Sequence, residues 1–264
     1  MEKLIVLGTG NGLVTKLYNT CFAIDDGEEY FLIDAGGGSQ ILSIFEQLNM
    51  DWNKVKNVFI THCHTDHITG MLWVIRKVAT MIKAGKYQGN LTIYGHDEVI
   101  HAIEEMCKVT LLKKQMNDQI CFQIVENGEN VMIGNYPVTF FDIHSTKAKQ
   151  FGFCTQLQNN KKLCCIGDEP YHAECEKYVK KSDWLLCEAF CLYQEREIYK
   201  PYQKHHSTVK EAGEIAEQLE VKNLVLWHTE DDHVDKKMLY QKEAEEYFSG
   251  NIYVPNDFDK IELI

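Results

Sequence analysis

The sequence predicts two mixed β-sheets that face one another, with helices on their outer surfaces. Short apolar or β-branched segments bounded by Gly, Asp and Asn recur along the chain, and segments with helical spacing of apolar residues interrupt them in both halves. This order of strands and helices is typical of a layered α+β protein. We expect a single domain over residues 1–264, because no Pro-rich or Ser-rich linker, charge block or repeat divides the chain.

The first half of the chain supplies five expected strands and three expected helices. The strands are expected at 4–7, 21–24, 30–33, 55–60 and 91–94, and the helices at 40–48, 70–84 and 97–108. Ser39 is placed to cap the first of these helices. The glycine-rich segment 8–12 lacks the spacing and the following helix of a dinucleotide-binding loop, so we interpret it as a tight loop between strands.

The second half is richer in strands. They are expected at 120–125, 131–133, 138–143, 151–157, 163–166, 184–187 and 221–227, with helices at 208–219 and 240–248. Thr208 opens the first of these helices with Glu211 three residues on, which is the spacing of a capping box.

The charge balance and hydropathy limit the function classes. Acidic residues outnumber basic ones by 39 to 27, for a formal net charge of −12, which argues against general binding to nucleic acid or anionic membrane. No segment approaches the roughly 18 consecutive apolar residues of a membrane span, and the apolar run at the amino terminus is too short for a signal peptide. We therefore expect a cytoplasmic protein with no membrane partner, whose ten cysteines are thiols.

The segment from His62 to His67 is the most informative part of the sequence. It places His62, His64, Asp66 and His67 within six residues, directly after the apolar strand at 55–60. Imidazole and carboxylate are ligands for Zn, Fe or Mn, and burying four such groups together without a metal would be unfavourable. We therefore predict that these four residues bind metal.

Three further candidate ligands stand where other predicted strands end. His144 follows the strand at 138–143, Asp168 follows the one at 163–166, and His228 ends the one at 221–227. An aspartate can bridge two metals through its two oxygens. The seven groups together would serve two divalent ions, which we expect to be Zn with Mn or Fe as alternatives, and would leave room for water or substrate.

The segment from Thr61 to His67, followed by Gly70, His144, Gly167-Asp168 and His228, resembles the signature of the metallo-β-lactamase fold superfamily. The resemblance implies an αββα sandwich with a dinuclear site at one end of the sheets. It implies that one metal is held by His62, His64 and His144, and the other by Asp66, His67 and His228, with Asp168 as the bridge. A hydroxide between the metals would be the nucleophile.

The resemblance narrows to ribonuclease Z and its phosphodiesterase relatives through Leu7-Gly8-Thr9-Gly10, Asn19-Thr20, Glu188-Ala189 and His206-Ser207-Thr208. It implies that Asp66, Glu188 and His206 are the catalytic residues, with His206, polarised by Glu188, supporting the leaving group. The neighbouring His205 is the alternative imidazole. The resemblance also implies a homodimer.

The sequence departs from ribonuclease Z in three places. His144 and Asp168 are only 24 residues apart, which leaves room for a hairpin but not for the arm that grips tRNA. The residues after Thr229 are acidic, where a phosphate-binding edge is expected, and Phe190 replaces the usual threonine after Glu188-Ala189. These departures keep the metal chemistry and weaken the assignment to tRNA.

Three functions compete. The leading hypothesis is a dinuclear metal-dependent phosphodiesterase, a ribonuclease Z-like hydrolase of phosphodiester substrates that include RNA. The alternative is a carbonyl hydrolase, such as a lactonase, thioesterase or β-lactamase-like enzyme, which the absence of the arm and the acidic segment favour. A relative that binds RNA without catalysis is the third hypothesis, and an intact ligand set argues against it.

Other residues are open to two interpretations. Asp34 either forms a turn before three glycines or supports the histidine loop, as metal sites generally require. Lys147 and Lys149 follow His144; we expect them in a solvated loop, and contact with a phosphate is the alternative.

Overall fold

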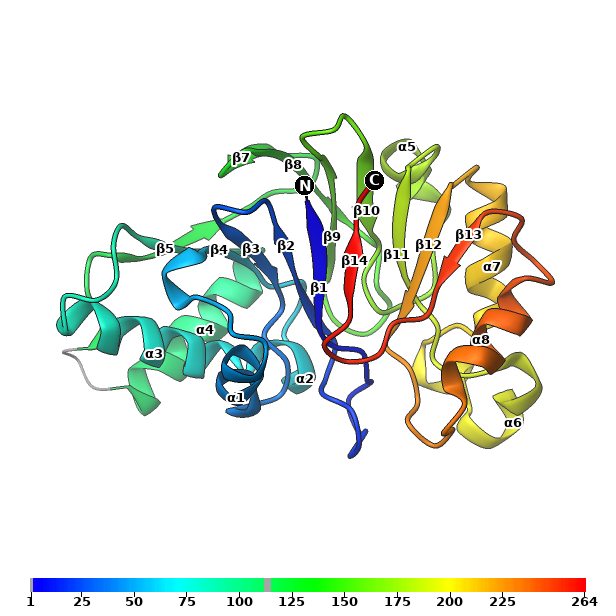
Figure 1. Ribbon diagram of the computed structural model, residues 1–264, viewed down its shortest axis with the longest axis horizontal. Coiled ribbons are helices and arrows are strands. Elements are labelled where there is room, and N and C mark those ends of the chain that lie inside the picture. The colour runs from blue at the N-terminus through cyan, green and yellow to red at the C-terminus, as the bar shows by residue number, and fades with distance from the viewer. Residues whose placement is uncertain (1, 112–114) are drawn as a thin grey trace.

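The computed structural model describes residues 2–111 and 115–264 and consists of two seven-stranded sheets with helices outside them (Figure 1). The first sheet has the order β14 (Lys260–Glu262), β1 (Lys3–Gly8), β2 (Cys21–Asp25), β3 (Tyr30–Ile33), β4 (Val55–Phe59), β5 (Leu91–Gly95) and β6 (Ile120–Ile124). The second has the order β13 (Asn251–Tyr253), β12 (Asn223–Trp227), β11 (Trp184–Glu188), β10 (Lys162–Cys165), β9 (Phe151–Gln156), β8 (Tyr136–Asp142) and β7 (Asn130–Ile133). The predicted αββα sandwich of two mixed sheets is confirmed.

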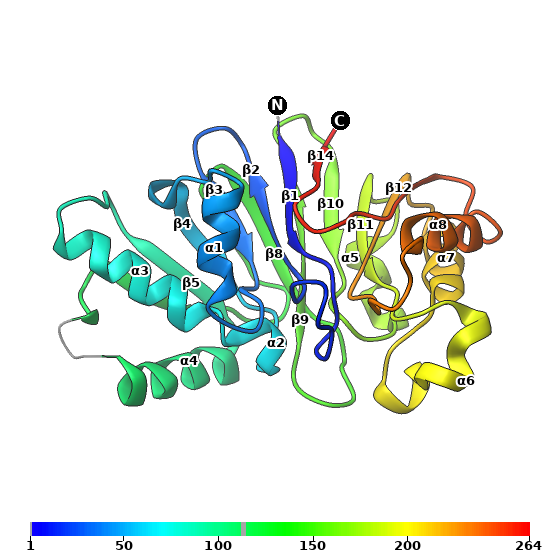
Figure 2. The ribbon, with the colours of Figure 1, turned by 60° about the horizontal axis from the view of Figure 1, so that its bottom comes forward.

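The helices form the two outer layers. They are α1 (Gln40–Gln47), α2 (Thr65–Ile68), α3 (Met71–Lys83), α4 (Asp97–Thr110), α5 (Glu176–Val179), α6 (Arg196–Tyr199), α7 (Val209–Gln218) and α8 (Lys236–Ala244). Figure 2 shows α1, α3 and α4 beside the first sheet, and α7 and α8 beside the second. None of the helices in the described ranges is both long and apolar enough to cross a membrane.

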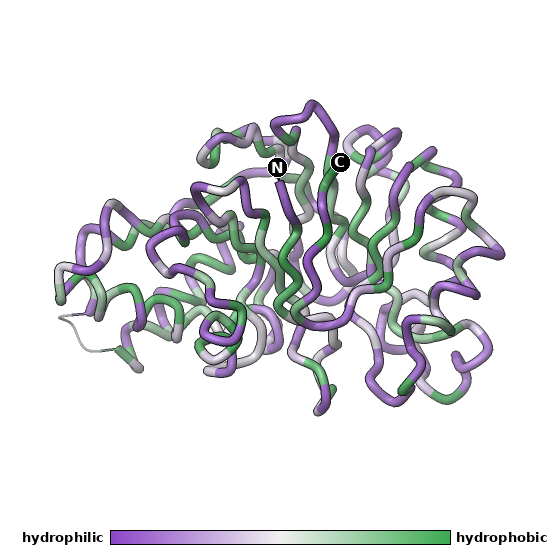
Figure 3. The backbone as a smooth tube through the Cα atoms, in the orientation of Figure 1, coloured by the Kyte–Doolittle hydropathy of each residue, from purple (hydrophilic) through white to green (hydrophobic). Residues whose placement is uncertain are grey.

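Alternation along the strands divides the core into three layers. On β12, Val225 and Trp227 point between the two sheets, whereas Leu224 and Leu226 point toward the outer helices. Successive side chains of a strand face opposite sides, so a strand covered on both sides is apolar throughout, as the green strands of Figure 3 show. The near-continuous apolar segments of the sequence were therefore a good guide to the strands.

Both sheets are mixed, and several strands that are far apart in the sequence end at the same edge. β3 to β6 run parallel in the first sheet and β10 to β13 run parallel in the second. β8 is antiparallel to β9, and β9 is antiparallel to β10, so β8 ends at the same edge as β10. α2, which follows β4, lies at this lower edge in Figure 1, whereas both termini lie at the upper edge.

Some expected elements differ from the structure. The last helix begins at Lys236 and ends at Ala244, so the prediction at 240–248 is displaced by four residues. β13 and β14 were not predicted, because each contributes only three residues to a sheet edge. The expected capping box at Thr208 is confirmed, but the side chain of Ser39 makes no capping hydrogen bond, and the prediction of that cap is wrong.

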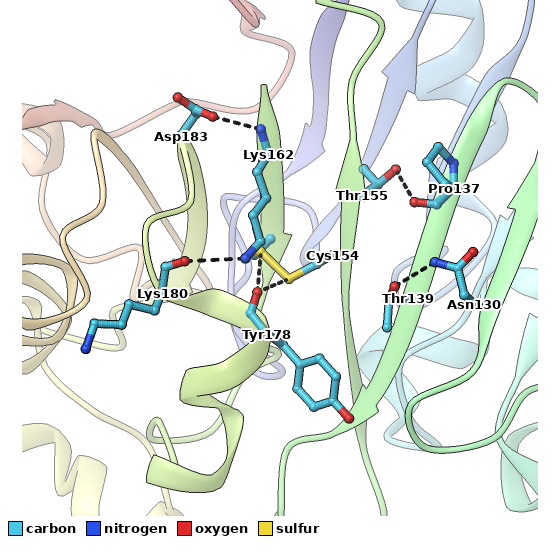
Figure 4. Close-up of a disulfide and its surroundings, with 10 residues drawn as sticks. Asn130, Pro137, Thr139, Cys154, Thr155, Lys162, Tyr178, Lys180 and Asp183 are labelled. Atoms are coloured by element: carbon cyan, nitrogen blue, oxygen red, sulfur yellow. Dashed lines mark hydrogen bonds between the residues drawn. A yellow bond between two sulfur atoms is a disulfide. The ribbon is translucent and has the colours of Figure 1, made fainter. Parts of the chain in front are cut away.

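The expectation that every cysteine is a thiol is also wrong. Cys154 on β9 and Cys164 on β10 form a disulfide, and the side chains around it are shown in Figure 4. The two residues are directly opposite in the antiparallel register, with their Cα atoms 4.1 Å apart, which brings their sulfur atoms within bonding reach.

Candidate metal centre

Four strands are followed by residues with left-handed backbone, and the chain turns there toward the candidate site. Asp34 follows β3 with φ 55°, His144 follows β8 with φ 61°, and His228 follows β12 with φ 55°. Gly167, with φ 77°, comes after β10 and directly before Asp168. Backbone of this kind is sparsely populated by residues other than glycine and is common at functional sites. Each strand therefore ends in an abrupt turn at the edge where the two sheets meet.

Three overlapping groups of metal-ligand side chains converge at this edge. Two of them consist of predicted ligands: the first contains His62, His64 and Asp168, and the second contains Asp66, His67 and His228. The third joins Asp168 and His228 to His206. Within each group, the potential ligand atoms lie within 4.8 Å of one another.

Asp168 lies between the two groups. Its Oδ2 atom is 3.6 Å from Nε2 of His62, 3.4 Å from Nε2 of His67 and 3.3 Å from Nε2 of His228. The same carboxylate therefore faces ligands of both groups, as expected of an aspartate that bridges two ions.

The residues fit a pair of divalent cations. Nε2 of His67, Nε2 of His228 and Oδ1 of Asp168 are buried, and none has a hydrogen-bond partner among the described residues. Buried polar atoms without partners are unfavourable, and these three belong to residues whose ligand atoms converge on a small volume. Imidazole nitrogens and carboxylate oxygens together suit Zn, Mn or Fe.

Charge coupling within the metal-free site is strong. Burial opposes ionisation of Asp66, but the neighbouring His67 and His228 outweigh it and hold the pKa of Asp66 far below its usual range. Burial also opposes the charged form of His67, yet the carboxylates of Asp66 and Asp34 raise its pKa well above normal. For His62, burial dominates and lowers the pKa. A metal ion would replace the proton that these groups share.

Asp34 supports the histidine loop, the second of its two interpretations. Its Oδ2 atom is 2.7 Å from Nδ1 of His67, and its Oδ1 accepts a hydrogen bond of 2.8 Å from the backbone N–H of Thr61. The side chain of Asp34 is fully buried. A carboxylate can only accept, so Nδ1 of His67 carries the proton and Nε2 keeps its lone pair for a metal.

His144 is the one predicted ligand that the structure does not bring to the cluster. Its Nε2 atom lies 2.9 Å from a carboxylate oxygen of Glu174, and its ring lies 5.1 Å from that of His172. The side chain is 36% exposed. The left-handed turn at His144 and the pairing with Glu174 together account for this placement, and its role as a ligand stays a prediction.

The two residues that the resemblance assigns to the leaving group lie together. His206 is buried, and its Nδ1 atom is 2.7 Å from the carbonyl oxygen of Asp168 and 3.4 Å from Oε2 of Glu188. The other oxygen of Glu188 accepts a 2.7 Å hydrogen bond from the hydroxyl of Ser207. Phe190 stacks on the His206 ring with a centroid distance of 4.6 Å. His205 is exposed and turned toward Thr146, so the structure brings His206 to the pocket and not its neighbour.

A pocket of about 350 Å³ opens over the centre. It is lined by Asn11, Gly12, Leu13, His64, Asp66, Asp168, Phe190, Lys204, His206, His228 and Glu230. The glycine-rich segment, expected only as a tight loop, reaches the site: a Cβ atom on Gly12 would lie 3.2 Å from the carboxylate of Asp66. This is tighter than most Cβ contacts, so the glycine lets the backbone lie close to the carboxylate without displacing it, and the spacing alone gave no sign of that contact.

The acidic segment after His228 is mostly turned away from the pocket. Asp231 accepts hydrogen bonds of 2.7 Å from the backbone N–H groups of Thr15 and Lys16, and Asp232 pairs with Lys16 at 3.7 Å. Glu230 alone of the three acidic residues lines the pocket. The acidic residues thus hold the loop 9–20 in place, and most of their charge does not face a substrate.

The two packed sheets and the His/Asp centre at their edge define a protein of the metallo-β-lactamase fold. Solved structures agree: the metallo-β-lactamase fold protein YhfI from Bacillus subtilis has a TM-score of 0.80 at 21% identity, covering 98% of both chains. The short form of human tRNase Z has a TM-score of 0.76 at 19% identity, covering 99% of both chains.

Sequence comparison narrows the class. The chain is 24% identical to ribonuclease Z of Nitrosopumilus maritimus over 99% of both sequences, so it is a ribonuclease Z-like member of the metallo-β-lactamase superfamily. A profile described as "Anti-Pycsar protein Apyc1" matches residues 2–249. The protein belongs to this anti-Pycsar Apyc1 family.

Proposed function

We propose that the protein is a phosphodiesterase that uses two divalent ions, in the first place Zn, to hydrolyse small phosphodiesters such as cyclic nucleotides. One observation carries the proposal: His206, backed by Glu188, lines the same pocket as ligands of both groups. A metal centre alone serves many hydrolytic reactions. An imidazole with a carboxylate behind it, set beside the metals, suits a reaction whose leaving oxygen needs a proton.

The proposed ligands follow the two groups. His62, His64 and His144 would hold one ion. Asp66, His67 and His228 would hold the other, and Asp168 would contribute to both. When bound, the ions act as Lewis acids toward water and toward the phosphate oxygens. The protein contributes the orientation of the ligands, above all through the contact of Asp34 with His67.

His206 is proposed to protonate the leaving oxygen. Its Nδ1–H donates to the carbonyl oxygen of Asp168, which fixes the ring and leaves Nε2 as the atom that can reach a substrate. Burial works against the charged ring, but Glu188 outweighs it and raises the pKa of His206. The ring therefore holds a proton more readily near neutral pH, and a positioned general acid contributes about 10²–10⁴-fold to a rate.

The dimensions of the site favour a small substrate. The pocket of about 350 Å³ is at the lower end of the range of small-molecule sites. Between His144 and Asp168 the chain forms only the β9–β10 hairpin, with no arm that could hold a folded RNA. The family is described as an anti-Pycsar protein. We infer that this chain has the anti-Pycsar activity and that it acts by hydrolysing a small phosphodiester.

The test compares substrates on metal-reconstituted and chelated protein. Bis(p-nitrophenyl) phosphate reports general phosphodiesterase activity, and 3′,5′-cyclic nucleotides with each of the four bases and a tRNA precursor report substrate size. We expect metal-dependent turnover of the small diesters and none of the precursor. Turnover of lactones or thioesters without any phosphodiester hydrolysis would instead select the carbonyl hydrolase.

His205 and His206 supply a matched pair of variants. His206→Ala should retain its metals and lose about 10²–10⁴-fold in turnover. His205→Ala removes an exposed neighbour of the same type and should stay within a few-fold of the wild type. Full activity of a metal-loaded His206→Ala protein would refute the assigned role.

A further inference from the structure

The loop between β8 and β9 is fixed against the pocket wall. The carboxylate of Glu169, which is buried, accepts hydrogen bonds from the hydroxyl of Ser145 at 2.6 Å and from the backbone N–H of Thr146 at 2.9 Å. Further along, the ammonium of Lys149 pairs with Asp97 at the start of α4. The buried carboxylate of Glu169 is therefore the anchor of the loop, because an ion pair between partly exposed side chains, such as that of Lys149 with Asp97, contributes little. Glu169 directly follows Asp168, so the anchor is continuous with the proposed metal centre.

This anchoring directs Lys147 toward the pocket. Its Nζ atom lies 3.5 Å from Nε2 of His206, the atom assigned above to the leaving group. His206 lines the pocket. The side chain of Lys147 is exposed, and its ammonium therefore lies at the rim of the pocket beside the His206 ring.

The ammonium of Lys147 is not neutralised by a carboxylate. Within the ranges 2–111 and 115–264 it forms no ion pair, and its side-chain contact is with the imidazole of His206. Its neighbour Lys149, two residues on, is paired. Lys204, the lysine that lines the pocket, lies 4.0 Å from Glu230. A cation near a pair of expected metal ions is repelled by them unless an anion lies between.

We propose that Lys147 is a substrate-positioning residue whose ammonium binds a phosphate oxygen of the substrate beside His206. The proposal rests on the proposed function, because it assumes that the anion in the pocket is a phosphodiester. It takes up the second interpretation of Lys147 in the sequence, contact with a phosphate. A lysine acts toward phosphate as a mobile point charge, which suits an exposed side chain at the edge of a pocket.

The experiment measures binding and turnover separately. Inorganic phosphate is the binding probe, titrated calorimetrically into metal-loaded protein, and bis(p-nitrophenyl) phosphate is the substrate. For Lys147→Met we expect the Kd of phosphate and the KM of the diester to rise about tenfold, with kcat within about twofold of the wild type. This split is expected because the contact is made equally in the ground state and the transition state.

Two variants separate charge from loop structure. Lys147→Arg retains the positive charge and should restore the Kd to within about threefold. Lys149→Met, in the same loop, removes an ammonium that is already paired with Asp97 and should leave both constants unchanged. The dependence of phosphate binding on salt should also be weaker in Lys147→Met than in the wild type.

The outcomes distinguish the two proposals. An unchanged Kd in Lys147→Met, or an equal loss in Lys149→Met, would overturn the role of Lys147. If the wild type hydrolyses no phosphodiester, the proposed function fails, while the Kd of inorganic phosphate still decides whether Lys147 binds an anion.

Discussion

Replacing Asp34 with asparagine should weaken metal binding although Asp34 itself is not a proposed ligand. The two oxygens of the carboxylate face three donors: Oδ1 accepts from the backbone N–H of Thr61, Oδ2 lies 2.7 Å from Nδ1 of His67, and the hydroxyl of Thr61 lies within 3.1 Å of both oxygens. An asparagine has one oxygen, so it cannot accept from both the backbone N–H of Thr61 and Nδ1–H of His67. With its oxygen toward Thr61, its NH₂ faces Nδ1 of His67 and forces the proton of the ring onto Nε2. With the amide reversed, NH₂ faces the N–H of Thr61.

The size of the effect follows from these contacts. A ring protonated on Nε2 has no lone pair there for a metal, so the tautomer must be changed back or the ring displaced before an ion binds. Loss of a charged hydrogen bond is worth about 1.5–3 kcal/mol, and loss of a supporting partner of a ligand typically lowers metal affinity about 10–100-fold. The two figures agree, because 1.4 kcal/mol corresponds to a factor of about ten.

The assay is a competition titration with a chromophoric chelator, with Zn as the probe metal. Asp34→Asn should lose about 10–100-fold in affinity for the ion that His67 is proposed to bind, while its circular dichroism spectrum stays that of the folded protein. Asp183→Asn is the control: this carboxylate accepts from the backbone N–H of Lys162 at 2.9 Å and pairs with Lys222, at the opposite edge of the sheet. Equal affinities of Asp34→Asn and wild type, or an equal loss in the control, would refute the reasoning.

Three further predictions concern the surroundings of the site. Glu174→Ala should bind Zn at least as tightly as the wild type, because it releases the predicted ligand His144. His144→Ala should bind Zn less tightly, because it removes that ligand, and an unchanged metal content would count against His144 as a ligand. Gly70→Ala should lower the free energy of unfolding by about 1–3 kcal/mol in urea titrations, since its Cβ would lie 1.9 Å from the carbonyl oxygen of Ala35; wild-type stability would contradict this packing. Burial lowers the pKa of Lys236 to about 8, so the folded state loses this proton before the unfolded state does, and stability should rise between about pH 8 and 10.5; Lys236→Met should lack that rise of up to roughly 3 kcal/mol.

The strands and the ligands at their ends could be predicted from sequence for the same physical reason. A strand covered on both faces must be apolar along its whole length, so a polar, titratable residue directly after such a segment is conspicuous. His62, Asp168 and His228 all follow this rule, and the structure brings all three together. Amphipathic helices such as α3 gave an equally clear signal, because their apolar residues recur with helical spacing.

Elements that depend on distant partners could not be predicted in this way. β14 gains its place through pairing with β1 at the other end of the chain, and three residues carry no periodic signal. α8 begins at Lys236, a residue that is buried although its type favours the surface. Its ammonium donates to the hydroxyl of Thr229, and nothing in the local sequence indicates that contact.

The loops around the pocket show the same limit at the level of function. The direction of Lys147 depends on Glu169, and that of His144 on Glu174, and both pairings cross between segments that are separate in sequence. Residue type and spacing indicate which side chains can bind a metal or a phosphate. They do not indicate which of these side chains are drawn away by another carboxylate.

The features that lower the free energy of unfolding are concentrated at the edge where the candidate metal centre lies. Asp34, His144 and His228 have left-handed backbone there, and Nε2 of His67 and Nε2 of His228 are buried with no hydrogen-bond partner in the part of the chain that the structure describes. Each feature lowers the stability of the metal-free fold. All of them lie at one edge, while the three apolar layers occupy the rest of the sandwich. The core therefore supplies the stability that this edge lacks, and divalent ions would satisfy the atoms that the protein leaves unpaired.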